Sequence, residues 1–157
     1  MDRTFFGAIG SDFELRGASE ARLARIQTGP WTTYVPTLAQ GAATVNKTVT
    51  YARYVRFGQT CIVQGDLACT SNGSSGTDVT VGLPLPAAAT ALATGIGAVY
   101  NASAGLYFKG GAEIVSSTTV KFFSFHSTAL GFLGSVSFTG MLSPGDLVRY
   151  YVTYEVA

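Results

Sequence analysis

From residue 31 to the C-terminus, apolar and polar residues alternate in short runs separated by turn residues. This pattern is typical of β-strands with one buried face, because successive side chains in a strand point to opposite faces of the sheet. About 8–10 such strands, at intervals of about 8–12 residues, predict an all-β domain over residues 31–157, an antiparallel β-sandwich of jelly-roll type. The predicted strands are 49–57, 60–64, 66–69, 79–83, 96–100, 106–108, 112–115, 120–126, 134–138 and 148–154.

Glycine-containing turns define the predicted hairpins. Gly58-Gln59 has glycine first, as two-residue hairpin turns prefer. We also expect turns at Lys109-Gly110-Gly111 and Pro144-Gly145-Asp146, and a β-bulge at Gly65. In the strand 49–57, alternation predicts one shared apolar face, with Arg53 as the exception, for Val49, Tyr51, Val55 and Phe57.

Residues 1–30 follow a different pattern and are predicted to form a separate N-terminal arm that contains a short helix. Ser19 is a suitable N-cap, residues 20–27 are good helix formers, and Gly29-Pro30 ends the segment. About nine residues are too few for a stable isolated helix, so this helix needs a partner. We expect its narrow apolar stripe to pack on the body or on copies of itself, through Leu15, Leu23 and Ile26.

The stretch before this helix is expected to attach the chain to another protein. Phe5, Phe6 and Ile9 stand close together among glycines. Exposed aromatic side chains are a liability in a solvated tail, so a docking arm explains them better. The run is too short, and too close to Asp2, for the hydrophobic region of a signal peptide, which we do not expect.

Charge is scarce and unevenly placed. Charged residues make up 12% of the chain, against about 25% in soluble domains, and eight of the nineteen lie in residues 1–30. Such a neutral body suggests a surface that meets other protein; a monomer covered by Ser, Thr and Gly is the alternative. The net charge of +1 without a basic run argues against nucleic-acid binding. No apolar stretch has the length of a membrane span.

The residue types that carry chemistry form no recognisable set. His126 is the only histidine and has no carboxylate near it in sequence to orient it. Cys61 and Cys69 are too far apart along one strand for a disulfide unless the chain reverses between them, and we expect free, buried thiols. We therefore predict no enzyme, metal site or cofactor, although a pair of carboxylates from distant positions stays open. The carboxylates of the body are Asp66, Asp78, Glu113, Asp146 and Glu155.

Aromatic residues are the richest functional group, with one Trp, eight Tyr and ten Phe. Exposed Tyr and Trp rings can stack on sugars, because their faces pack on C–H groups while their edges form hydrogen bonds. Tyr100, Asn101 and Tyr107 flank one predicted loop and are candidates for glycan contact. The alternative is that the rings fill the core or a subunit interface.

Short segments in a fixed order point to a family. The body opens with WTTYVPTL at 31–38 and continues with YARYVRFGQT at 51–60 and LPLP at 83–86. It closes with GDL at 145–147 and YEVA at 154–157. This order, over residues 31–157, resembles a β-sandwich module of virion proteins from tailed phages, especially those of actinobacteria, where it occurs in minor tail and tail fibre proteins.

The resemblance implies a non-enzymatic homotrimer displayed on the surface of a phage particle. It carries over no catalytic residue, because the family pattern marks strands and turns. Only a 30-residue arm precedes the module here, so we expect a capsid decoration protein, or a short adhesin on a tail baseplate, rather than a long fibre. The implied partners are copies of this chain, major capsid or tail/baseplate proteins and, for the adhesin, a host cell-surface glycan.

Overall fold

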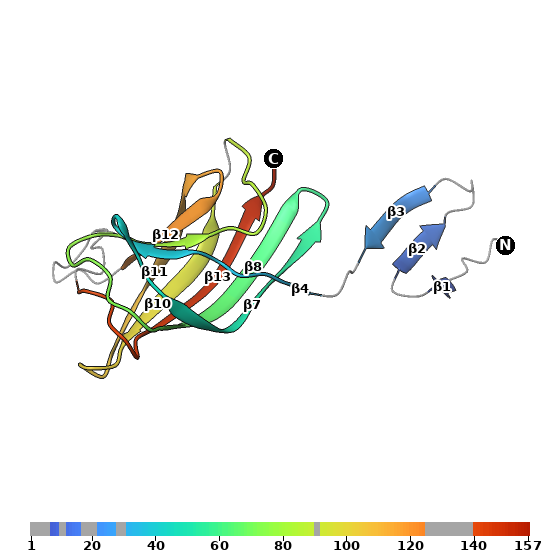
Figure 1. The fold of residues 1–157 in the computed structure, drawn as a ribbon. Helices are drawn as coiled ribbons and strands as arrows, with labels where there is room; N and C mark the ends of the chain where they lie inside the picture. Colours follow the sequence, from blue (N-terminus) through green and yellow to red (C-terminus); the bar gives the residue numbers. More distant parts are fainter. Residues whose placement is uncertain (1–6, 10–11, 17–21, 28–30, 90–91, 125–139) are drawn as a thin grey trace, which may run out of the picture.

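Strand β8 (Thr60–Cys69) shows most directly how the sequence pattern produces the fold. Every second residue from Cys61 to Cys69 is buried, and the residues between them are partly exposed. Strand β13 (Leu147–Glu155) alternates in the same way and pairs with β8 along its whole length. These two strands lie in the middle of the body (Figure 1).

The computed structural model describes residues 7–9, 12–16, 22–27, 31–89, 92–124 and 140–157, and the side chains of 31–89, 92–122 and 140–157. The regular elements in these ranges are all strands. Besides β8 and β13 they are β1 (Gly7–Ile9), β2 (Asp12–Arg16), β3 (Arg22–Gln27), β4 (Thr32–Thr33), β5 (Leu38–Gln40), β6 (Ala43–Thr44), β7 (Lys47–Phe57), β9 (Val79–Gly82), β10 (Thr94–Asn101), β11 (Leu106–Ser116) and β12 (Thr119–Ser124).

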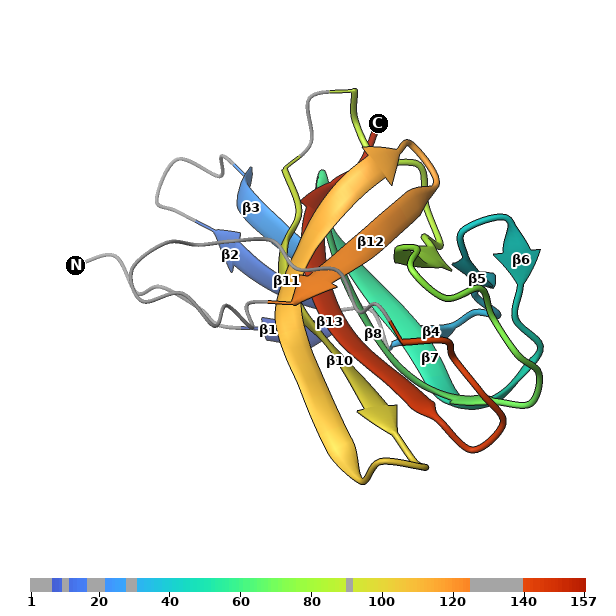
Figure 2. The same ribbon diagram turned by 90° about the vertical axis from the view of Figure 1, so that its left-hand side faces the viewer.

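Ten of these strands form one sheet, in the order β4-β7-β8-β13-β10-β11-β12-β9-β5-β6. Every neighbouring pair is antiparallel. Figures 1 and 2 show the sheet curled into a half-barrel. The prediction of an antiparallel all-β body is therefore confirmed.

An extended strap, residues 32–40, joins the two ends of the curled sheet. It begins as β4, which pairs with β7, and ends as β5, which pairs with β9 near the opposite end of the strand order. Between them, Tyr34 N donates to Ala52 O and Thr37 O accepts from Gly82 N, both at 3.0 Å. The strap thus holds β7 and β9 together from a single stretch of chain.

The inner face of the sheet forms the core, mainly from leucine and valine. Burying each such side chain contributes about 1.5–3 kcal/mol. The buried amide of Gln40 fastens a loop to this core, since its Nε2 donates to Gly140 O at 2.7 Å and its Oε1 accepts from Leu142 N at 2.8 Å. The aliphatic side chains with at most 1% exposure are Leu38, Val45, Val63, Leu67, Val79, Val81, Val120, Leu142, Val148 and Val152.

Strand β7 departs from simple alternation. Its pairing register shifts between Val49 and Tyr51, so Thr50 is an extra residue. Val49 consequently packs against the core, whereas Tyr51 is 45% exposed. The prediction that these two share a face is wrong, because one inserted residue reverses the alternation. The β-bulge predicted at Gly65 of β8 is therefore found at Thr50 of β7 instead.

Two of the three predicted turns are confirmed. Gly58 and Gly145 have positive φ angles of 59° and 95°, which glycine adopts readily. The predicted turn at 109–111 is wrong, because β11 runs through it without interruption and pairs with β10 on one side and β12 on the other. Its glycines therefore lie inside a paired strand and do not reverse the chain. The predicted strand 134–138 lies outside the described residues.

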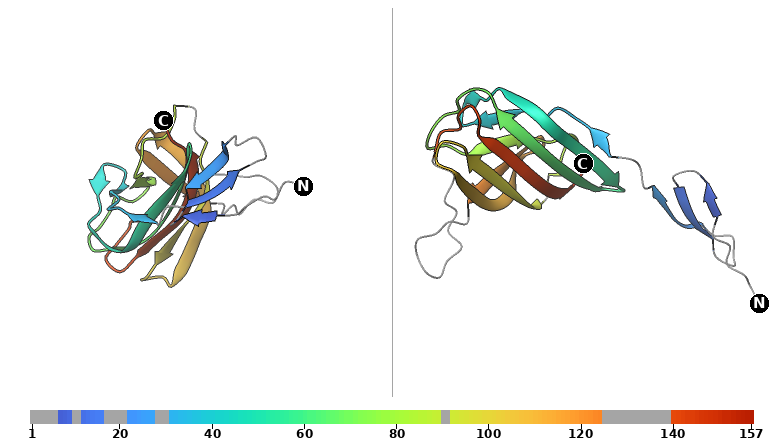
Figure 3. Two further views of the ribbon diagram at one scale, coloured as in Figure 1. Left: turned by 90° about the vertical axis from the view of Figure 1, so that its right-hand side faces the viewer. Right: turned by 90° about the horizontal axis from the view of Figure 1, so that it is seen from below.

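Residues 7–27 contain a second, smaller sheet in the order β1-β2-β3 (Figure 3). Strand β3 occupies most of the segment predicted as a helix, so the structure replaces that helix by a strand. Pairing with β2, in which Phe13 opposes Ile26, provides the backbone partners that a lone short helix lacks. In the described part of the chain, no helix is long and apolar enough to cross a membrane.

Cys61 and Cys69 are buried on the inner face of β8 and form no disulfide, as predicted. Burial raises the pKa of both thiols, that of Cys69 to about 11. They are therefore protonated at neutral pH and pack as small apolar groups.

Candidate functional site

The outer face of the sheet, turned away from the core, carries two rows of side chains that cross β7, β8, β13, β10 and β11 in turn. Cross-strand neighbours in such rows lie close enough to act on one ligand together. The first row is Tyr51, Asp66, Arg149, Ala98 and Lys109. The second row is Arg53, Gln64, Tyr151, Ile96 and Gly111.

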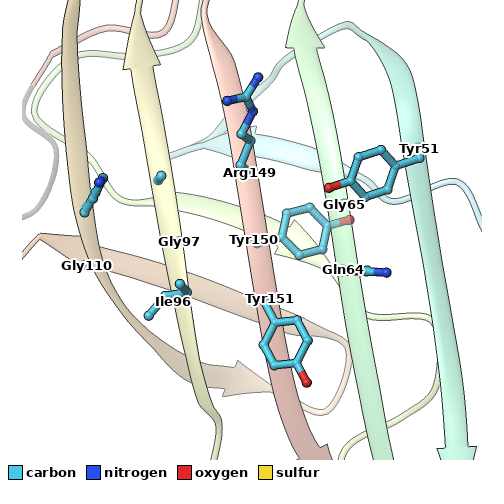
Figure 4. A pocket seen from close by; sticks show the side chains of 11 residues that line it. Tyr51, Gln64, Gly65, Ile96, Gly97, Gly110, Arg149, Tyr150 and Tyr151 are labelled. Atoms are coloured by element: carbon cyan, nitrogen blue, oxygen red, sulfur yellow. The ribbon is translucent and has the colours of Figure 1, made fainter.

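The surface over these rows is hollowed into an open depression of about 380 Å3. This volume falls within the usual range of small-molecule sites, about 300–1,000 Å3. Figure 4 shows Tyr51 on β7, Arg149 and Tyr151 on β13, and Ile96 on β10 around it. The full lining is Tyr51, Gln64, Gly65, Ile96, Gly97, Ala98, Lys109, Gly110, Arg149, Tyr150 and Tyr151.

The floor of this depression is a row of three glycines and one tyrosine: Gly65, Tyr150, Gly97 and Gly110 oppose one another across β8, β13, β10 and β11. A Cβ atom on Gly65 would collide with the Tyr150 ring, and one on Gly97 with the ring of Phe122. The two rings stack with centroids 5.9 Å apart. Aromatic rings therefore cover the glycine backbone from the inside, and the floor is only one backbone thick.

The phenol of Tyr150 is held from the inner side. Its Oη lies 2.8 Å from Tyr34 Oη, and the Tyr34 ring packs edge-on against Tyr54 at a centroid distance of 6.0 Å. Burial raises the pKa of Tyr150 to about 12 and also raises that of Tyr34. Both phenols are thus neutral at physiological pH and fix the floor in place.

Arg149 stands in a fixed position at one end of the depression. Its Nε donates to Asp66 Oδ2 at 3.0 Å, and Tyr107 lies near it. The Asp66 side chain is only 14% exposed, and its other oxygen is buried without a partner among the described atoms. An arginine held in this way is oriented before any ligand arrives.

Arg53 links exposed aromatic rings beside the depression. Its guanidinium carbon lies 4.9 Å from the Trp31 ring centroid and 5.7 Å from that of Tyr51, both within the range of cation–π contacts, about 6 Å. The Gln64 side-chain amide is oriented with its oxygen toward Arg53. In this orientation Gln64 Oε1 accepts from Arg53 Nη2 at 2.7 Å. Two aromatic planes and a cation are therefore held together at this edge.

Two of the three residues predicted to contact a glycan, Tyr100 and Tyr107, lie at the end of the same face. Tyr100 and Tyr107 are paired across β10 and β11, with ring centroids 4.6 Å apart. Tyr107 is 52% exposed, whereas Tyr100 is half-buried. Asn101 is engaged in the turn between the strands, since its Oδ1 accepts from Ser103 Oγ at 2.8 Å and Ala104 N at 2.9 Å. Of the three, Tyr107 is the ring best placed for a ligand.

The structure places the other predicted site residues as follows. Ile9 lies in β1, Leu15 in β2, and Leu23 and Ile26 in β3. Ile9, predicted for attachment, and the three residues predicted for self-association therefore belong to one small sheet. Phe5, Phe6 and His126 lie outside the described residues.

Four of the five carboxylates of the body, all except Glu155, serve ion pairs or turns. Asp78 and Glu113 both contact Lys121 Nζ, at 3.8 and 3.1 Å. Asp146 is buried and accepts from Ala102 N at 2.8 Å and from Ser143 N at 2.9 Å, which ties two loops together. Within the described ranges, no group of three or more His, Cys, Asp or Glu residues is arranged to hold a metal ion.

The geometry of the depression suits binding by stacking and charge. Sequence reasoning missed its main residues, which are Tyr51, Tyr151 and Arg149. These side chains come from β7 and β13, and only the order of strands in the sheet places them beside those of β10. The exposed alternation of Arg149 and Tyr151 in the last strand was the available signal. No protein family, curated protein or solved structure matches this chain.

Proposed function

We propose that the protein is a non-enzymatic structural module of a tailed-phage virion, displayed on the particle as a homotrimer and attached through residues 1–30. In this proposal the half-barrel is the core of a jelly-roll-like body, and the partners are capsid or tail/baseplate proteins. The order of the sequence motifs over residues 31–157 supports the assignment.

The observation that carries the proposal is the charge-poor body with large apolar side chains on its surface. Val35 is 81% exposed and Leu92 86%, and neither lines the outer-face depression. Val115 at 51% and Met141 at 41% add to this apolar surface. Contacts between copies of the chain would bury such groups.

The small N-terminal sheet supports attachment. Its three strands are short, and none of them pairs with a strand of the larger sheet in the described ranges. A sheet of this size needs an apolar face to pack against for stability. A surface of the particle supplies such a face in the proposed function.

Light scattering on the purified full chain tests this proposal. We expect the mass of three chains, and we expect a chain of residues 31–157 to keep that mass but to fail to join particles. A monomer at micromolar concentration would contradict the trimer. Particle binding by the shortened chain would contradict attachment through the arm.

The second candidate is a receptor-binding adhesin that recognises a carbohydrate. The Tyr100–Tyr107 pair and the aromatic-lined depression beside it favour this candidate, since both lie on the outer face of the sheet. It is compatible with a trimer that leaves the outer face exposed.

A further inference from the structure

We propose that the outer-face depression binds an acidic saccharide, with sugar rings against Tyr51 and Tyr151 and acidic groups toward Arg149 and Lys109. The inference rests on the second candidate function and names its site and ligand class. It does not depend on trimer formation, which is measured separately.

Stacking is the first requirement that the depression meets. Tyr51 and Tyr151 are each 45% exposed and stand on β7 and β13, with β8 between them. Ile96 extends the apolar wall on β10 and is 66% exposed. Rings that are exposed on a rigid sheet offer their faces to sugar C–H groups at little conformational cost.

Charge complementarity is the second requirement. The two outer-face rows contain three cations, Arg53, Lys109 and Arg149, from three different strands. Their single carboxylate, Asp66, is mostly buried and bound to Arg149. The face is therefore positive in a body that is otherwise poor in charge, and it attracts carboxylate or phosphate groups.

Preorganisation of the side chains is the third requirement that the depression meets. Asp66 holds Arg149, and the stacked rings of Tyr150 and Phe122 support the floor from inside. Gln64 adds an amide to the lining, which suits sugar hydroxyls. A ligand that enters this site therefore orders few side chains.

A second copy of the chain is the competing occupant. A two-fold contact through this face would bring the same cations of both copies together, which opposes association. In a trimer the face would meet a different surface of the next copy, and the oligomer measurements on the variants below test that arrangement. A curved depression between two rings also suits a saccharide better than a flat protein surface does. We therefore assign the depression to the saccharide and the apolar groups elsewhere to self-association.

Calorimetric titration of the full chain with three probes tests the ligand class. The probes are trigalacturonate, which has rings and carboxylates, maltotriose, which has neutral rings, and triglutamate, which has carboxylates without rings. We expect trigalacturonate to bind at least about tenfold more tightly than either of the other two. Equal binding of triglutamate, tighter binding of maltotriose, or no binding of trigalacturonate would overturn the proposal.

Matched variants locate the site. We expect Tyr151→Ala to weaken trigalacturonate binding by roughly three- to tenfold, as the loss of one aromatic contact does. Lys109→Gln should weaken it to a similar extent and reduce its dependence on salt. The controls are Phe57→Ala and Arg56→Gln, which remove an exposed aromatic ring and a cation outside the lining and should leave binding unchanged.

The same variants separate this proposal from its alternatives. Each variant is also measured by thermal unfolding and light scattering, so that a folding defect is recognised. If Tyr151→Ala abolishes the oligomer, the face belongs to self-association and the saccharide site is refuted. If Phe57→Ala weakens binding as much as Tyr151→Ala does, the depression is not the site. A stable monomer that still binds trigalacturonate would refute the trimer and leave this inference standing.

Discussion

Tyr150 and Tyr151 are neighbours in the chain but lie on opposite faces of the sheet, 5% and 45% exposed. On the inner face, the Tyr150 ring covers Gly65, stacks on Phe122, and pairs its phenol with Tyr34. On the outer face, the Tyr151 ring forms part of the wall of an open depression. The comparison teaches that a residue type alone does not indicate its role here: inner tyrosines hold the sheet together, and outer ones are available to a ligand.

Truncating each tyrosine in turn gives the largest test of this contrast. We expect Tyr150→Ala to lower the free energy of unfolding by about 3–5 kcal/mol, because it opens a cavity and leaves Tyr34 without its partner. Tyr151→Ala should change it by no more than about 0.5 kcal/mol. Urea denaturation measures both, and similar costs for the two variants would contradict the assignment of the faces.

Gly65→Ala tests the contact beneath the depression. Its Cβ would meet the Tyr150 ring, so we expect a loss of about 1–3 kcal/mol in unfolding free energy. The double variant Gly65→Ala/Tyr150→Ala is the control. In the Tyr150→Ala background the added methyl group has room, so the cost of Gly65→Ala should largely disappear. Additive costs would show that the ring is not what excludes a side chain.

Tyr34→Phe tests how the inner-face phenols make the unfolding free energy depend on pH. The variant loses one part-buried hydrogen bond, worth about 1 kcal/mol near neutral pH. The ordinary pKa of Tyr150 is 10.0 and its folded value is about 12, and Tyr34 is raised as well. The unfolded chain therefore loses these protons first, so stability is complete below pH 10 and falls as pH rises toward 12.

Denaturation at pH 8, 10 and 11 checks this expectation. The unfolding free energy of Tyr34→Phe should fall less steeply above pH 10 than that of the unchanged protein, because one buried phenol no longer titrates. Tyr151→Phe is the control on the exposed face and should keep the slope of the unchanged protein. A slope that Tyr34→Phe leaves unaltered would show that this phenol does not couple folding to pH.

The smallest effect is expected for an exposed ion pair. Glu113 Oε2 lies 3.1 Å from Lys121 Nζ, and the Glu113 side chain is 56% exposed. We expect Glu113→Gln to lower the unfolding free energy by less than about 0.5 kcal/mol, since solvent and salt screen such pairs. A loss of more than about 1 kcal/mol, measured by urea denaturation at low and high salt, would mean that charge at the surface stabilises this sheet more than we infer.

The fold was most predictable where burial follows strict alternation. The outer limits of β8 and β13 lie within a few residues of the predicted ones, because the burial alternates and the turns at Gly58 and Gly145 carry clear signals. However, β8 runs without a break through Gly65, where two strands separated by a bulge were predicted. Prediction failed where a glycine is compatible with either a turn or the interior of a strand. Gly110 reads as a turn residue in sequence, but in the structure it opposes Gly97 in the middle of two paired strands.

The candidate site was only partly predictable. Tyr107 was recognised beside a loop, and it lies near Arg149 at the end of the outer face. Tyr51 was placed on the wrong face relative to Val49, because an extra residue such as Thr50 leaves no trace in the pattern. The remaining residues come from strands that are distant in sequence, so their proximity depends on strand order, which alternation does not encode.

The strap gives the body a particular response to mechanical load. If residues 1–30 hold the chain to a particle, a pull on the body enters at β4, which is paired with β7 by only two residues, Thr32 and Thr33. Those pairs can peel away one after the other, and each released residue lengthens the tether by about 3.3 Å. The force then reaches Tyr34, whose N donates to Ala52 O and whose phenol pairs with that of Tyr150, and only after that the fully buried Leu38 beside β9. The first residues of the strap therefore detach and extend first. The sheet behind them bears the load only after these residues have been released.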